Sequence, residues 1–108
     1  MEMKNMRTLK FIVDRQSITP APNCDFSGIA PGTIGYLEAS FAFSEEWRGC
    51  GKIAVFENVG EKYPVKLQND RCIIPSGALT WKRFVVWVIG VRQGYRINTG
   101  KAEVRQDE

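Results

Sequence analysis

Apolar and polar side chains alternate with a period of two along most of this chain. The clearest case is residues 36–44, in which Leu37, Ala39, Phe41 and Phe43 occupy every second position. Successive side chains of a strand point to opposite faces, so these four share one face, which is predicted to be buried. Because no segment has a convincing amphipathic helical period, the sequence predicts an all-β fold.

Turn-forming residues divide the alternating segments at intervals of about 8 to 12 residues, a spacing typical of a β-sandwich. The chain has 108 residues and 44% apolar composition, which is enough for one hydrophobic core. We therefore predict a single domain over residues 1–108, folded as an immunoglobulin-like, two-sheet antiparallel sandwich, with a small β-barrel as the alternative. About seven strands are expected, at residues 8–14, 36–44, 52–57, 62–68, 71–74, 83–92 and 95–105.

Three features predict where individual strands lie. Residues 83–92 are apolar on both faces and rich in β-branched side chains, so this strand is expected in a sheet interior. Pro64 cannot donate a hydrogen bond to a neighbouring strand, which predicts an edge position. Gly100 predicts a bulge or bend midway along the last strand.

Two connections are predicted from turn-forming residues. Asn69 and Asp70 are expected to form the turn of a hairpin between residues 62–68 and 71–74. Residues 15–35 are rich in Pro, Gly, Ser and Asn. This composition predicts a long loop, or a loop that holds one short edge strand.

Composition removes much catalytic chemistry. The chain contains no histidine, which is the commonest general base and the commonest metal ligand. Residues 49–52 read GCGK but lack the leading glycine of a phosphate-binding loop, and Ile53 stands where Ser or Thr is required. Glu45 and Glu46 could be imagined as the paired carboxylates of a glycosidase, but adjacent residues of a strand face opposite ways. They are expected to be solvated loop acids. We expect a protein that is not an enzyme and that uses no cofactor and no metal.

The cysteines and the charges limit the class of protein further. Cys24, Cys50 and Cys72 lack metal-ligand spacing and are expected to be buried or half-buried thiols, with a Cys24–Cys50 disulfide left open. The net charge of +3 is spread without a block of like sign, so nucleic acid is not an expected partner. No apolar run approaches the roughly 20 residues of a membrane helix, and no signal peptide is visible.

Most aromatic residues lie on predicted strands, where core packing is the expected role. Trp81 is the exception, because it falls in a turn beside Lys82 and Arg83. An exposed indole there would suit a glycan or a partner protein. The candidate interaction surface is therefore Trp81, Lys82, Arg83 and Trp87.

The order of short motifs is also informative: FxV, FAFSEEW, KIAVF, YPVKL and CIIP follow one another, and a final apolar strand ends at Gly90. This order resembles the small N-terminal-type domains of baseplate and tail-associated structural proteins in phages and prophages of Gram-positive bacteria. The resemblance implies a sandwich in a multi-copy virion assembly, without catalysis or a cofactor. The matching positions are Phe41, Phe43, Trp47, Lys52, Ala54, Phe56, Tyr63, Leu67, Cys72, Ile74, Pro75, Gly90 and Thr99.

Two functional hypotheses follow. The first is a non-enzymatic virion structural module that binds copies of itself or other virion proteins. It would be located in the virion, or in the cytoplasm of the producing bacterium before assembly. The alternative is a carbohydrate-binding module that recognises a host surface glycan through loop aromatics such as Trp81.

Overall fold

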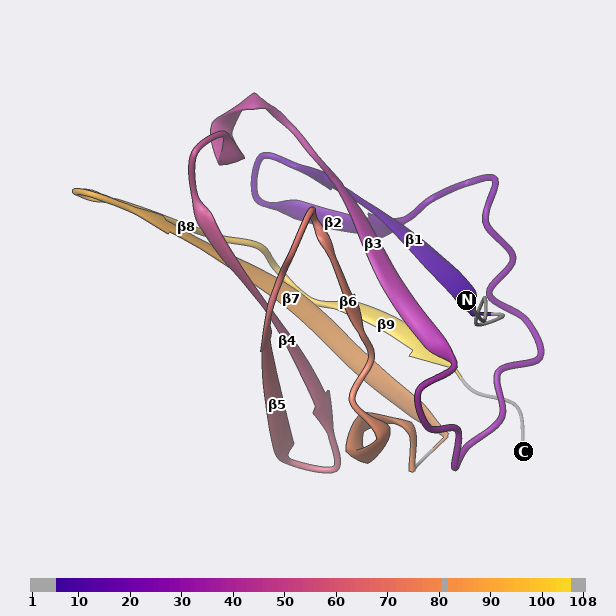
Figure 1. Cartoon of the computed structure of the whole chain (residues 1–108). Helices are drawn as coiled ribbons and strands as arrows, with labels where there is room; N and C mark the ends of the chain where they lie inside the picture. The colour runs from indigo at the N-terminus through magenta and orange to yellow at the C-terminus, as the bar shows by residue number, and fades with distance from the viewer. Residues whose placement is uncertain (1–5, 81, 106–108) are drawn as a thin grey trace, which may run out of the picture.

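Two β-sheets pack face to face in the computed structural model, which describes residues 6–80 and 82–105 (Figure 1). The four-stranded sheet has the order β2-β1-β3-β6: β1 (Arg7–Asp14), β2 (Ser17–Pro20), β3 (Leu37–Phe43) and β6 (Arg71–Ile73). The five-stranded sheet has the order β5-β4-β7-β8, with β9 also paired to β7. Its strands are β4 (Gly51–Asn58), β5 (Glu61–Lys66), β7 (Arg83–Arg92), β8 (Tyr95–Asn98) and β9 (Ala102–Arg105). The predicted two-sheet sandwich is confirmed, and the sheets do not close into a barrel.

The core lies between the inner faces of the two sheets, where the alternating apolar side chains meet. Phe11 of β1 stacks on Phe41 of β3 with 5.4 Å between ring centroids. Across the core, Phe56 of β4 and Phe84 of β7 lie 6.0 Å apart. Each such ring contributes roughly 1.5–3 kcal/mol when it is fully removed from water.

Trp47 joins the two sheets. It ends the short 3₁₀ helix η1 (Glu45–Trp47) that follows β3, and its side chain is fully buried. Its indole Nε1 donates a hydrogen bond of 2.8 Å to the carbonyl oxygen of Arg15. The ring lies against Gly90 of β7, where a Cβ atom would be 2.7 Å from Cε3. Glycine is therefore required at Gly90, because any side chain would collide with the indole.

The positions predicted for β7, Pro64 and Gly100 agree with the structure. β7 is central, with β4 on one side and both β8 and β9 on the other. β5, which contains Pro64, is an edge strand. The predicted last strand is divided around Gly100 into β8 and β9. The backbone amide of Gly100 donates a hydrogen bond of 3.0 Å to the carbonyl oxygen of Gln16.

The predicted hairpin between residues 62–68 and 71–74 is wrong. β5 pairs with β4, whereas β6 crosses to the other sheet and pairs with β3. The turn residues Asn69 and Asp70 both have positive φ, 53° and 61°, and they redirect the chain between the sheets. Only an isolated bridge, Gln68 to Arg71, remains at this turn.

Three further details differ from the expectations or resolve them. The described residues contain nine strands, because β2 lies in the predicted loop and the last strand is divided. β1 and β3 pair in parallel, so the sandwich is not wholly antiparallel. Cys24, Cys50 and Cys72 are free thiols, which excludes the Cys24–Cys50 disulfide in this structure.

Residues 21–36 connect β2 to β3 and are held by a few side chains. Ile29 is buried, and the ring of Phe26 packs edge-on against Phe11 at 5.5 Å. A second 3₁₀ helix, η2 (Ser76–Leu79), precedes β7 and contributes Ala78 and Leu79 to the core. Neither this helix nor any other in the described ranges is long and apolar enough to span a membrane.

Candidate functional site

The predicted interaction residues fall on, or just before, the central strand of the five-stranded sheet. Arg83 and Trp87 lie on the outer face of β7, since inner positions alternate with them along the strand. Lys82 is exposed immediately before β7. Trp81 lies outside the described residues, so its predicted exposure stays a prediction.

Four aliphatic side chains lie around Trp87 on the outer face of β4 and β7. Ile53 lies opposite Ile89, and Val55 lies opposite Trp87 in the register of the two strands. Opposite residues of an antiparallel pair share a face, and their Cβ atoms are about 5 Å apart. The exposed fraction is 38% for Ile53 and 7% for Val55, which its neighbours cover. We call this set the outer patch: Ile53, Val55, Val85, Trp87 and Ile89.

Basic side chains surround the outer patch. Lys66 lies opposite Ile53, and Lys62 lies opposite Glu57, both on the edge strand β5. On the other side Arg96 of β8 lies opposite Val91. Among the described residues on the strands of this outer face, six are basic and two are acidic: Lys62, Lys66, Arg83, Arg96, Lys101 and Arg105 with Glu57 and Glu103.

This charge distribution is uneven for the molecule as a whole. Six basic against two acidic residues give the described strands of the five-stranded sheet a net charge of +4 on their outer face. The whole chain carries +3, so all remaining residues together carry −1. The positive charge that is scattered in the sequence is thus collected on one face by the strand register.

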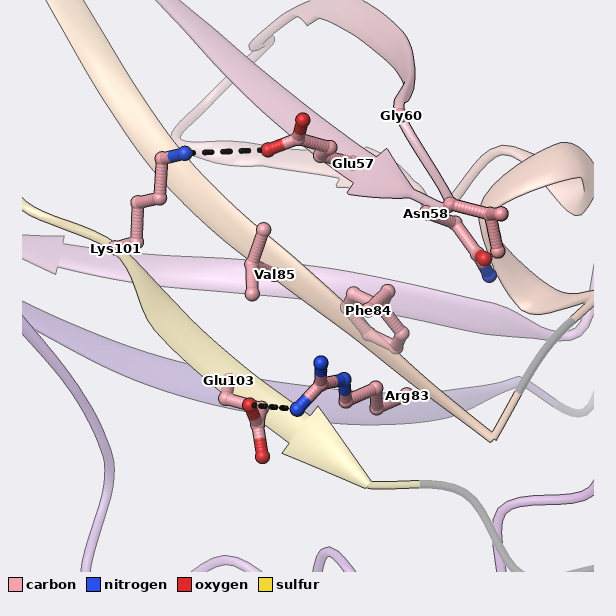
Figure 2. Close-up of a pocket in the computed structure, with 9 residues that line it drawn as sticks. Glu57, Asn58, Gly60, Arg83, Phe84, Val85, Lys101 and Glu103 are labelled. Carbon is pink, nitrogen blue, oxygen red and sulfur yellow. Dashed lines mark hydrogen bonds and ion pairs between the residues drawn. The ribbon is translucent and has the colours of Figure 1, made fainter.

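Two ion pairs border a hollow above Val85 (Figure 2). Lys101 Nζ lies 3.2 Å from Glu57 Oε1, and Arg83 Nη1 lies 3.1 Å from Glu103 Oε2. The hollow has a volume of about 430 Å³, and these four side chains line it together with Val85. Exposed ion pairs of this kind contribute only about 0–1 kcal/mol to stability.

Lys101 also contacts Trp87, which lies beside a second hollow of about 350 Å³. Its ammonium lies 4.8 Å from the centroid of the indole ring, a cation–π contact. Arg96 and Asn98 line the same hollow, and Arg96 Nε donates to Asn98 Oδ1 at 3.2 Å. The indole is therefore flanked by donors and cations.

The groups considered for catalysis are distributed differently. Glu45 and Glu46 lie on η1, and the side-chain hydrogen bond from Ser44 holds the pKa of the Glu46 carboxyl below its usual range. Lys52 of the GCGK segment is paired with Asp70 at 2.8 Å and lies 4.5 Å from the ring centroid of Phe43. In the described part of the chain, no group of three or more His, Cys, Asp or Glu is placed to hold a metal ion.

One buried polar group was not anticipated from the sequence. Asn58 is 4% exposed, and its Nδ2 donates to the carbonyl oxygen of Ala78 at 2.6 Å. Its Oδ1 has no hydrogen-bond partner among the described atoms. The bond to Ala78 attaches η2 to the end of β4. Asn58 therefore has a structural role at one side of the hollow above Val85.

Sequence reasoning also missed most of the residues of this face. The available signal was that residues 52–57 and 83–92 are apolar on both faces. Two neighbouring strands with this pattern place a second set of apolar side chains on the solvent side of the sheet. The flanking residues Lys62, Lys66 and Arg96 could be assigned to the same face only after the register was known.

Comparisons with protein-family models, with curated proteins and with solved structures found no match for this chain.

Proposed function

We propose that this protein is a non-enzymatic binding module that docks onto another protein through the outer patch. The observation that carries the proposal is the row of apolar side chains in register on the solvent side of β4 and β7. A sandwich needs only its inner faces to be apolar, and its outward positions are normally polar. The outer patch exceeds what the fold requires, and a contact with a partner would account for it.

The composition of the face supports a protein interface. Tryptophan in the centre of a patch is a frequent hot spot, and charged residues commonly form the surrounding rim. Trp87 is central here, with aliphatic neighbours on both strands and lysines or arginines at the periphery. The absence of histidine from the chain supports the non-enzymatic part of the proposal.

The motif resemblance supplies a setting for this proposal. Phage baseplates and tails are multi-copy assemblies, in which a small rigid sandwich serves as a structural part. We propose that the chain is such a virion structural module, in the virion or, before assembly, in the bacterial cytoplasm. Its partners would then be other virion proteins or copies of itself.

A second candidate function is carbohydrate binding at the hollow beside Trp87. The polar groups of Arg96, Asn98 and Lys101 around an indole favour it. Two observations make it the weaker candidate. Trp87 is the one aromatic side chain on this outer face among the described residues, and Lys101 lies against its ring. A glycan array with the whole chain tests it, and binding that is lost in Trp87→Ala would favour this candidate over the first.

Photo-crosslinking in the cells that naturally produce the chain tests the first proposal. A benzophenone amino acid replaces Ile53 on the outer patch, and in a matched control it replaces Ser40 on the outer face of the other sheet. We expect one discrete protein adduct from position 53 and none from position 40. The same adducts from both positions, or none from position 53, would overturn the proposal.

A further inference from the structure

We infer that the partner of the outer patch is an acidic protein surface and not a second copy of this chain. This inference rests on the proposed function, because it assumes that the patch docks onto a protein. Its first support is the net charge of +4 on a face whose centre is apolar. Complementary charge across an interface guides association and excludes partners of like charge.

The cations free to meet a partner lie at two opposite edges of the patch. Glu57 and Glu103 hold Lys101, Arg83 and Arg105 in ion pairs. In contrast, no carboxylate within the described residues forms an ion pair with Lys62, Lys66 or Arg96. Both lysines lie on β5 and are exposed, and Arg96 lies on β8.

The strand order gives the spacing that a partner must match. From β5 to β8 there are three inter-strand steps, through β4 and β7. At about 4.8 Å a step, the two basic edges are separated by about 14 Å. A matching partner would therefore present an apolar centre with carboxylates on both sides of it, and the two groups of carboxylates would be about 14 Å apart.

A second copy of the chain does not meet this specification. A symmetric face-to-face dimer through the patch would bring a charge of +4 against +4. The outer face of the four-stranded sheet offers no complement, because its charged strand residues are two acidic and two basic: Asp14 and Glu38 with Lys10 and Arg71. Association through this patch is therefore expected to be heterotypic.

A nucleic acid also fits poorly. Single-stranded nucleic acid needs aromatic side chains on which successive bases stack. Trp87 is the one aromatic group available on this face in the described chain, and its neighbours are branched aliphatic side chains. Glu57 and Glu103 would also repel phosphates from the middle of the face.

Peptide selection with the full chain tests the inference. A random displayed 12-residue library is selected on the protein, and the enriched peptides are synthesised and measured by fluorescence anisotropy. We expect peptides with apolar anchors between Asp or Glu residues. Binding should weaken at least tenfold at 0.5 M salt and be lost in Trp87→Ala or, as a second variant, Ile89→Thr.

Matched charge reversals separate the two faces. Lys62→Glu with Lys66→Glu should weaken binding at least tenfold. Lys10→Glu with Arg71→Glu, on the other outer face, should change it less than twofold. If peptides require Trp87 but are neutral or basic and insensitive to the Lys62 and Lys66 reversals, the acidic partner is wrong while the docking face stands.

Other outcomes also decide. No enrichment, or enriched peptides that bind Trp87→Ala and Ile89→Thr as well as the native chain, would overturn both the inference and the docking face. A concentration-dependent dimer in sedimentation velocity that is lost in Trp87→Ala would show that the occupant is a second copy. Binding of a fluorescein-labelled dT20 probe at 0.15 M salt that depends on Trp87 would show that the ligand is a nucleic acid.

Discussion

The outer faces of the two sheets differ, although their inner faces follow the same rule. On the four-stranded sheet the outward side chains of β1 are mostly polar, with Thr8, Lys10 and Asp14 around a single Ile12. On the five-stranded sheet the outward positions of β4 and β7 are mainly apolar, and the charges lie around them. The first face shows that this sandwich does not need an apolar exterior. The apolar side chains of the second face are therefore better explained by contact with a partner than by a requirement of folding.

The largest expected effect compares the two sides of the five-stranded sheet at glycines. Gly90→Ala places a Cβ 2.7 Å from Trp47 Cε3 on the inner side, and Trp47 is fully buried. We expect the free energy of unfolding to fall by about 2–3 kcal/mol, in the upper part of the roughly 1–3 kcal/mol that overpacking usually costs. Urea unfolding followed by tryptophan fluorescence measures it.

The matched control is Gly51→Ala on the outer side of the same sheet. A Cβ there would lie 3.8 Å from the Val91 carbonyl oxygen, which is an ordinary contact distance. We expect no loss, or a gain of up to about 1 kcal/mol, because alanine restricts the unfolded chain more than glycine. Equal losses in the two variants would contradict the close packing assigned to the inner side alone.

The next effect uses one substitution at two positions of β7. Val88→Thr puts a hydroxyl into the core, where Val88 is fully buried, and should cost about 2 kcal/mol. Val85→Thr, on the outer patch, should cost less than about 0.5 kcal/mol, because water reaches that position. Chemical denaturation compares them. A loss for Val85→Thr as large as that for Val88→Thr would make the outer patch part of the structural core and remove the case for docking.

A smaller effect compares one ion-paired glutamate on each outer face. Glu103→Gln removes contacts of 3.1 Å with Arg83 and 3.3 Å with Arg105, and Glu38→Gln removes one of 3.7 Å with Arg71. Each should change stability by less than about 1 kcal/mol in thermal unfolding. Only Glu103→Gln should also strengthen binding of the acidic peptides, since it raises the charge of the docking face. Equal binding changes in both variants would show that the two faces are not electrically distinct.

Local pattern was enough to predict most strands of this fold, but not how they pair. Residues 83–92 and Pro64 were placed correctly, because burial on two faces and a missing amide donor are local properties. The partner of β6 was predicted wrongly, because pairing with β3 depends on residues about 30 positions away. Trp47 lies between the predicted strands 36–44 and 52–57, outside any alternating segment, yet it is fully buried against Gly90.

The candidate site was predictable only in part for the same reason. Arg83 and Trp87 are on the outer face of β7, but Lys62, Lys66 and Arg96 join them through the register of three other strands. Scattered charges in the sequence indicate a solvated surface, and only the pairing of strands shows that they share a face. The charge of the face is a property of topology, not of composition.

The smallest expected effect concerns the inner face of the four-stranded sheet, at Cys72 of β6. Burial, with a smaller contribution from the Glu38 carboxylate, raises the pKa of this thiol from 9.0 to about 12. A pKa raised by folding stabilises the protein fully below the unfolded value, and this contribution is lost as the pH rises from about 9 toward 12. At pH 9 half of the unfolded thiols are ionised, so the loss relative to pH 7 is about 0.4 kcal/mol, and it grows at higher pH.

The measurement is the difference in unfolding free energy between pH 7 and pH 9 for the native chain and for Cys72→Val. Other titrating groups cancel in this double difference. The raised pKa of Cys72 leaves very little thiolate in the folded protein at pH 8, so iodoacetamide should leave this residue unmodified until the chain unfolds. Rapid alkylation of Cys72 in the folded protein would show that water enters this inner face. The inner face of the four-stranded sheet would then not exclude water, and the two sheets could no longer be said to differ only at their outer faces.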